Sequence, residues 1–223
     1  MQQDWLLRMI QQISSFVAGI KKLRQKGEWA AVHATVEDGI GRYVGLNPSL
    51  VHAISEDDLI QLLSTRSGVN LDRWWALAEL LREEAIALDA QGDSAGAERA
   101  FAKSLRLSLE VLNESEEVPS YLDVTELEMV IERMLDKPLT MATRRELTGY
   151  LVATVRYDQA ENVVLWAVDE DRAEAAYDAH AFYERLSKID DATLEAGGLS
   201  RDEVHDGLIR FTDATGSLPA PQY

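Results

Sequence analysis

Apolar residues recur three and four positions apart through almost the whole chain, which is the spacing of an amphipathic helix. The first stripe of this kind consists of Leu6, Met9, Ile13, Phe16, Ile20 and Leu23, widened by Ile10 and Val17. Basic residues at 21–26 fall in its last turn, where cations meet the negative end of the helix dipole, and Gly27 follows as a C-cap. The pattern predicts an N-terminal amphipathic helix over 1–26 that packs on the body of the protein or on a partner.

The same spacing predicts further helices along the rest of the chain. They are expected at about 28–45, 56–66, 72–89, 94–113, 123–136, 143–154, 158–169, 172–189 and from 200 onward. Capping-box patterns at Thr143–Glu146 and Ser200–Glu203 mark two of the helix starts, whereas Asn47-Pro48 reads as a break. No segment alternates in the manner of a strand for more than about five residues. The sequence therefore predicts an all-α fold of about ten helices, mostly in antiparallel pairs.

One type of turn recurs between predicted helices. It occurs at Lys26-Gly27-Glu28, at Gln91-Gly92-Asp93 and at Val155-Arg156-Tyr157. Each time a small or flexible residue is expected to turn the chain, and a small residue on the next helix lets the two backbones approach. The third turn has Val155 where glycine is usual, and the first has Val32 at the small-residue position.

The second of these units resembles a tetratricopeptide repeat. The resemblance rests on Ala85, Leu88, Gly92, Asp93, Ala97, Phe101 and Leu105. The units lie about 64 residues apart instead of the usual 34, so other helices must join the array. The resemblance implies a tetratricopeptide-like α-α superhelix, or solenoid, in which the first helix of each pair lines a concave groove.

The opening Gln3–Ile10 resembles the start of an uncharacterised bacterial all-helical family, a domain of unknown function with similar helical-repeat content. This resemblance implies a bacterial, cytoplasmic protein and carries no known activity. The expected organisation is a single helical-repeat domain over 1–213 and a flexible tail over 214–223, where glycine and proline gather.

Charge and composition narrow the function classes. The net charge of −17 repels phosphate backbones, so we expect no nucleic-acid partner. No apolar run reaches about 18 residues, so no membrane span is expected, and the N-terminus lacks the pattern of a secretory signal. The chain has no cysteine, which excludes thiol catalysis and disulfides and favours a cytoplasmic location.

The repeat resemblance places four cations on groove-lining faces, which is notable in so acidic a chain. They are Lys21, Arg24, Arg82 and Arg145. The hypothesis is a groove for an acidic or C-terminal peptide, with Arg82 and Arg145 as carboxylate clamps. The alternative is that these cations pair with nearby carboxylates of the chain, as Arg82 could with Glu79 and Glu83.

A second candidate site is the stripe Tyr177, His180 and Tyr183, spaced three apart. It could form a small polar pocket or a proton-transfer site, or it could be an interfacial stripe of amphipathic side chains, the interpretation that we favour. The glycines at 39, 41 and 45 approach a dinucleotide fingerprint but lack the preceding strand, so they are expected to serve the helix end or close packing. The acidic clusters lack calcium-loop spacing, and no cofactor or metal is predicted.

The sequence thus favours a non-enzymatic, tetratricopeptide-like scaffold for protein–protein interaction or self-association, for example as a homodimer. The alternative is an enzyme or small-ligand-binding protein with a pocket near Tyr177, His180 and Tyr183. A third hypothesis makes the basic N-terminal helix a membrane-surface anchor, although its cations gather at one end.

Overall fold

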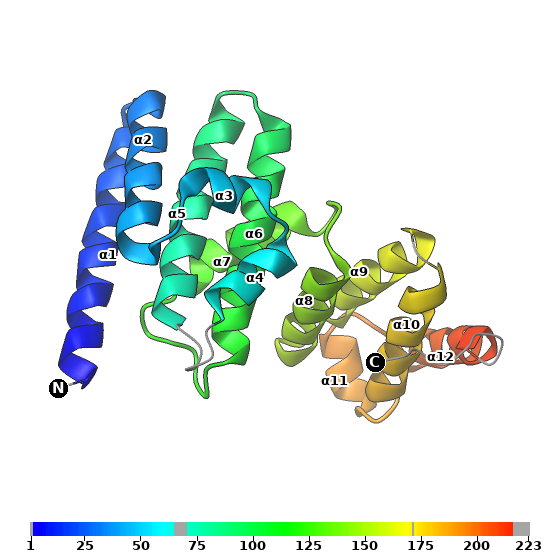
Figure 1. Cartoon of the computed structure of the whole chain (residues 1–223). Helices are drawn as coiled ribbons and strands as arrows, with labels where there is room; N and C mark the ends of the chain where they lie inside the picture. Colours follow the sequence, from blue (N-terminus) through cyan, green and yellow to red (C-terminus); the bar gives the residue numbers. More distant parts are fainter. Residues whose placement is uncertain (1, 65–70, 171, 216–223) are drawn as a thin grey trace. The chain divides into compact units, whose positions relative to one another are not determined.

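The computed structural model of the chain describes residues 2–64, 71–170 and 172–215. These residues contain twelve α-helices and a short π-helical segment, and they contain no strand (Figure 1). The predicted all-α fold is confirmed, with more helices than the ten expected. None of the described helices has the length and apolar character needed to cross a bilayer.

The packing divides the chain into two compact units, residues 1–138 and 139–223. The division falls at Pro138, which lacks a backbone N–H and disfavours helix in the residue before it. The single domain expected over 1–213 stays a prediction, because two compact units can still unfold together. Of the predicted tail 214–223, residues 214 and 215 belong to the last helix, and 216–223 lie outside the described residues.

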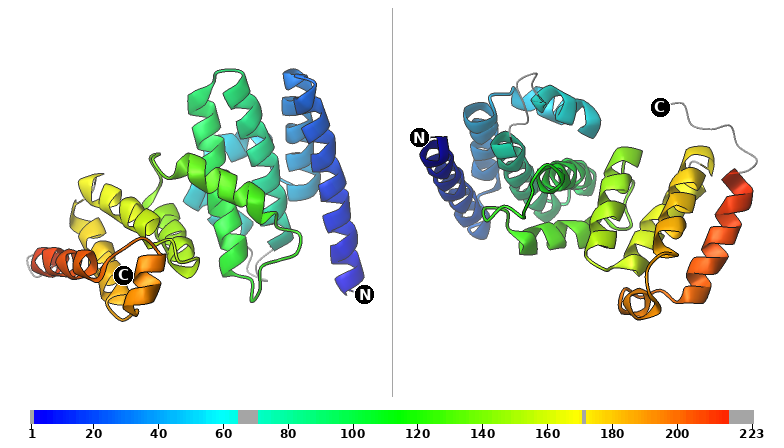
Figure 2. Two further views of the ribbon diagram at one scale, coloured as in Figure 1. Left: turned by 180° about the vertical axis from the view of Figure 1, so that it is seen from behind. Right: turned by 90° about the horizontal axis from the view of Figure 1, so that it is seen from below.

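Unit 1 consists of the following elements: α1 (Gln2–Gln25), α2 (Trp29–Gly39), the π-helical η1 (Ile40–Val44), α3 (Pro48–Ala53), α4 (Glu56–Leu63), α5 (Leu71–Ala90), α6 (Ser94–Asn113) and α7 (Val124–Met134). Helices α1, α2, α5 and α6 stand side by side (Figure 1). Helices α3 and α4 cover one side of the α5–α6 pair, and α7 crosses the other side (Figure 2). Helix α1 therefore packs along the body of its own unit, through its buried Ile13, Val17 and Ile20.

The core of unit 1 surrounds α5, which is buried on nearly all sides. Trp74 and Trp75 are both buried, although neighbouring residues on a helix point about 100° apart. On α6, Phe101 and Leu105 are buried as well. A helix that is covered all round forces even its polar residues into the interior, and this placement creates the ionic cluster described below.

Local caps explain where several helices of unit 1 begin. Ser55, Asp93 and Asp123 each accept hydrogen bonds from backbone N–H groups of the first turn that follows. Asn47 does the same for α3, with Pro48 at the first helical position. The predicted break before Asn47-Pro48 is confirmed, since η1 ends at Val44, but the sequence interpretation missed the short helix that asparagine followed by proline starts there.

Unit 2 consists of α8 (Met141–Ala153), α9 (Tyr157–Glu170), α10 (Arg172–Leu186), α11 (Asp191–Ala196) and α12 (Arg201–Thr215). Helix α9 packs on α8 and α10, and α10 packs in turn on α12. The capping box of Ser200 and Glu203 is confirmed, since the backbone N–H of each residue donates to the side-chain oxygen of the other. The box at Thr143 is wrong: Thr140 caps α8, and Thr143 is fully buried inside it.

The three predicted turns share one geometry. Gly27, Gly92 and Val155 all adopt positive φ, at 71°, 82° and 58°. After each turn a backbone N–H bonds the carbonyl five residues earlier: Glu28 to Leu23, Asp93 to Leu88, and Arg156 to Leu151, at 3.1, 3.0 and 2.9 Å. This is the Schellman ending of a helix, so the recurrence predicted from sequence is real at the level of the turn.

Val155→Gly is expected to stabilise unit 2 by roughly 0.5–1 kcal/mol, because a β-branched residue pays about 1–2 kcal/mol in the left-handed region. Val155 is 39% exposed, so little packing is lost. Denaturant unfolding followed at Trp166, the one tryptophan of unit 2, would measure the gain. The matched change Val124→Gly, at an exposed position with ordinary helical φ, should give no gain, and a gain there would contradict the explanation.

Candidate functional site

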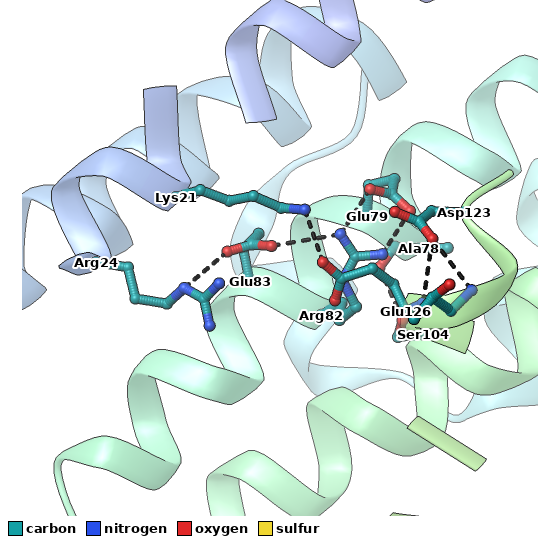
Figure 3. Close-up of polar contacts among 10 residues, drawn as sticks. Lys21, Arg24, Ala78, Glu79, Arg82, Glu83, Ser104, Asp123 and Glu126 are labelled. Carbon is teal, nitrogen blue, oxygen red and sulfur yellow. Dashed lines mark hydrogen bonds and ion pairs between the residues drawn. The ribbon is translucent and has the colours of Figure 1, made fainter. Parts of the chain in front are cut away.

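Arg82 lies at the centre of a partly buried ionic cluster in unit 1 (Figure 3). Its side chain is 4% exposed, and its two terminal nitrogens each donate to one carboxylate oxygen of Glu79 at 2.7 Å. One of these nitrogens also lies 3.3 Å from Glu83, and Nε lies 3.6 Å from Glu126 on α7. A single guanidinium thus faces three carboxylates, which its planar fork of donors suits.

Two cations from α1 complete the cluster. Lys21 donates to Glu126 at 2.8 Å, and Arg24 Nε lies 3.2 Å from the second oxygen of Glu83 (Figure 3). Three cations therefore meet three carboxylates, and the cluster ties α1, α5 and α7 together. We call this set of six residues the ionic cluster.

Burial and charge oppose each other in the ionic cluster. Burial raises the pKa of Glu79 above its ordinary value, and the charge and hydrogen bonds of Arg82 offset only part of this effect. Burial would also raise the pKa of Glu126, but the hydrogen bond from Lys21 and the charge of Arg82 lower it below its ordinary value. Arg82 itself is held protonated, since its carboxylate partners outweigh its burial.

The ionic cluster accounts for three of the four cations predicted to line a peptide groove. Lys21, Arg24 and Arg82 do come together, but each faces carboxylates of its own unit. The alternative interpretation of Arg82, that it pairs with Glu79 and Glu83, matches its contacts, although the pairs are buried and not at the surface. The fourth cation, Arg145, belongs to unit 2.

A groove of about 230 Å³ crosses unit 2 between α8, α9 and α10. Its floor is apolar and includes Val152, Val163, Ala167 and Phe182, all largely buried. Gly149 of α8 leaves part of this space open, because a Cβ built there would meet no atom within 4 Å. The floor can therefore receive a small apolar side chain.

Arginines from two helices border the same groove: Arg144 and Arg145 on α8, and Arg185 on α10. Arg145 Nε donates to Asp178 at 2.8 Å, and the Arg144 guanidinium lies 5.2 Å from the centre of the Trp166 ring. Asp178 is the one carboxylate among the described residues that line the groove, so the described lining is net positive in a chain of charge −17. We call it the arginine groove. Its chemistry suits an anionic group joined to an apolar one.

The stripe of Tyr177, His180 and Tyr183 lies on α10 and does not line the arginine groove. Tyr183 is buried, stacks on Phe211 of α12 at 5.8 Å and donates to Glu161 of α9 at 2.6 Å. Burial and this carboxylate raise the pKa of the Tyr183 hydroxyl above its ordinary value. Tyr183 thus joins three helices, which is the part played by an interfacial side chain.

The other sequence motifs serve packing and capping in the described part of the chain. Gly39 lies where a Cβ would come within 2.8 Å of both Phe16 and Leu80, and Gly45 ends η1 in the left-handed conformation. Among the described residues, no group of three or more His, Asp or Glu side chains could hold a metal ion.

The sequence interpretation missed Arg144, Arg185 and Asp178 as neighbours of Arg145. Gly149 was the available signal, because a glycine inside a helical pattern costs about 1 kcal/mol relative to alanine and leaves open space on its face of the helix. It also missed that helix 71–90 carries apolar residues on every face, a distribution that is typical of a buried helix and would have placed Arg82 in the interior.

Comparison with known proteins adds the family. No match was found among curated proteins, and none was found among solved structures. A family of unknown function (DUF6483) matches residues 1–216, nearly the whole chain. The predicted resemblance to an uncharacterised all-helical family is thereby confirmed, and the chain belongs to the DUF6483 family.

Proposed function

We propose that this protein is a non-enzymatic, tetratricopeptide-like helical scaffold that binds an acidic peptide segment of a partner protein in the arginine groove. The observation that carries the proposal is the groove itself, an apolar floor bordered by Arg144, Arg145 and Arg185. An apolar side chain of the peptide would occupy the floor while neighbouring carboxylates meet the guanidinium groups. The repeated Schellman turns support the repeat-like character. The resemblance of Gln3–Ile10 to a bacterial family supports a bacterial setting, and the cysteine-free composition supports a cytoplasmic one.

Charge complementarity favours this partner over a basic one. The body of the protein repels acidic partners in general, so an acidic segment can approach with net attraction only where cations gather. Self-association through α1 stays a prediction. Because Ile13, Val17 and Ile20 of α1 are already buried in unit 1, light scattering of the full chain tests it better than removal of residues 1–26.

Selection of random displayed peptides on the full chain tests the proposal. We expect the enriched peptides to carry Asp or Glu on either side of Leu, Ile or Phe, and their binding to weaken with added salt. Gly149→Leu fills the floor, so it should weaken binding at least about tenfold, and Arg185→Glu should do the same by repulsion. The same change at an open glycine of unit 1, Gly19→Leu, is the matched control and should leave binding unchanged.

A substitution of the opposite sign sharpens the test. Asp178→Asn removes one carboxylate that competes with the peptide for Arg145, so it should tighten binding of the selected peptides by a few-fold. Failure to enrich any peptide, enrichment of basic peptides, or binding that Gly149→Leu leaves intact would each overturn the proposal.

A further inference from the structure

A second cavity, of about 370 Å³, lies in unit 1 where α2, α3, α5 and α6 meet. Its floor is formed by the buried Glu84 and by Leu81 and Ala100, with the half-buried Leu88 beside them. The exposed rim carries charged and polar side chains, among them His52, Glu37 and Arg99. The cavity holds far more than one water molecule, whose share of liquid volume is about 30 Å³.

Glu84 is the unusual group in this cavity. Its side chain is 8% exposed, and its Oε2 is buried with no hydrogen-bond partner among the described residues. Its Oε1 lies 3.8 Å from His33 Nδ1 and 3.6 Å from His52 Nε2, both beyond hydrogen-bond distance. A buried carboxylate oxygen without a donor is costly, so this arrangement calls for a donor from outside the chain.

Two neighbouring donors, Lys103 and Gln91, are already engaged. The ammonium of Lys103 donates to the carbonyls of Val51 and His52 at 2.7 and 2.9 Å. The amide nitrogen of Gln91 lies 3.0 Å from the carbonyl of Ala87 and 2.7 Å from His33 Nε2. Because an amide nitrogen only donates, His33 Nε2 accepts, and its proton sits on Nδ1.

The charge around Glu84 determines the kind of ligand. Burial raises the pKa of Glu84 to about 7, together with the negative charge of a second carboxylate, that of Glu37. The positive charge of Lys103 offsets part of this increase. A cation placed between Glu37 and Glu84 would relieve both the desolvation and the repulsion. A simple anion would meet the Glu84 carboxylate on the floor, and no metal-holding group of three ligands exists among the described residues.

We propose that this cavity binds a small primary amine, whose ammonium donates to Glu84 and whose alkyl part lies on Leu81, Leu88 and Ala100. A primary ammonium carries three N–H donors on one compact cation. It can therefore donate to the unpaired Oε2 of Glu84 while its charge also attracts the nearby carboxylate of Glu37. The cavity is separate from the arginine groove and lies in the other unit, so the two proposals fail independently.

The pH dependence of binding follows from the groups that face Glu84. These are His33 and Glu37 from α2 and His52 from α3. Asp93, the N-cap of α6, and the cations Arg99 and Lys103 within α6 complete the set. The pKa of Glu84 is raised to about 7, so below that pH its carboxylate becomes protonated and loses the negative charge that attracts a cation. Amine binding should therefore weaken roughly tenfold from pH 8 to pH 6.

The test is a titration of the full chain with propylamine at pH 8, followed by the side-chain NMR signals of His33 and His52. We expect saturable shifts with a dissociation constant of about 1–10 mM, as suits so small a ligand. Glu84→Gln should weaken binding at least about tenfold, and Glu37→Gln, a change on the exposed rim, should weaken it a few-fold. Glu117→Gln makes the same change of charge in an exposed loop of the same unit and should have no effect.

Propionate, of similar size and opposite charge, is the ligand control and should give no saturable shift. Three results would each overturn the proposal: no saturation by propylamine, binding of propionate as tight as that of propylamine, or unchanged affinity in Glu84→Gln. Glu84→Gln is expected to remain folded, because glutamine has the same shape and carries no charge to desolvate, so loss of binding can be separated from loss of structure.

Discussion

Replacing Arg82 by Met is expected to lower the free energy of unfolding of unit 1 by about 3–5 kcal/mol, the cost of leaving buried charges without their partner. Methionine fills similar volume, so the loss reports charge and hydrogen bonds and not a cavity. Glu79 loses both of its 2.7 Å bonds, and the fully buried Glu83 keeps Arg24 as its one cationic partner among the described residues. Denaturant unfolding followed by tryptophan fluorescence would measure this, since four of the five tryptophans lie in unit 1.

Two further variants separate the ionic explanation from a general packing defect. The triple change Arg82→Met, Glu79→Gln and Glu83→Gln removes the stranded charges, so it should regain a large part of the lost stability. Arg82→Lys keeps the charge but cannot make the bidentate bond, so it should fall between the wild type and Arg82→Met. Equal losses in the single Met variant and the triple variant would contradict the ionic account.

The helices were predictable because their signals are local. Periodicity located the long helices, and the turn at Gly92 is read directly from the glycine and the capping aspartate after it. The short helices α3 and α11 were missed because six residues cannot show a 3.6-residue period. Their sequence signals are the N-cap residues, which are Asn47 followed by Pro48 for α3 and Asp190 for α11.

The ionic cluster and the cavity were not predictable in the same way, because their partners are distant in sequence. Lys21 and Glu126 are 105 residues apart, and His33 and Gln91 are 58 apart. The local pairing of Arg82 with Glu79 follows from helical spacing. Its burial does not, since it depends on α1 and α7 packing against α5. For the same reason Glu83 and Glu84 are alike in the sequence, yet Glu83 joins the ionic cluster and Glu84 faces the cavity.

Replacing Glu84 by Gln is expected to stabilise the protein at pH 8 and to change its stability little at pH 5. The pKa of Glu84 is raised from its model-peptide value of 4.5 to about 7 in the folded state, chiefly by burial. Between these two pH values the folded state binds more protons than the unfolded state, so the free energy of unfolding falls as pH rises. The full shift corresponds to at most about 3 kcal/mol of destabilisation above pH 7. Glutamine of the same shape carries no charge to desolvate and should recover about 1–3 kcal/mol of this, less the cost of burying its own amide.

Unfolding of the wild type and of Glu84→Gln at pH 5, 6, 7 and 8 would measure the effect as a difference that grows with pH. Glu37→Gln removes a charge that repels Glu84, but Glu37 is itself exposed and no buried charge is removed. It should therefore reproduce only a minor part of the gain in stability. Glu83→Gln is the informative contrast, because it removes the neighbouring buried carboxylate from its pairs with Arg24 and Arg82. It should destabilise unit 1 at pH 8, so adjacent glutamates on one helix should respond with opposite sign. If the difference between wild type and Glu84→Gln were flat from pH 5 to pH 8, Glu84 would not be a strained buried carboxylate.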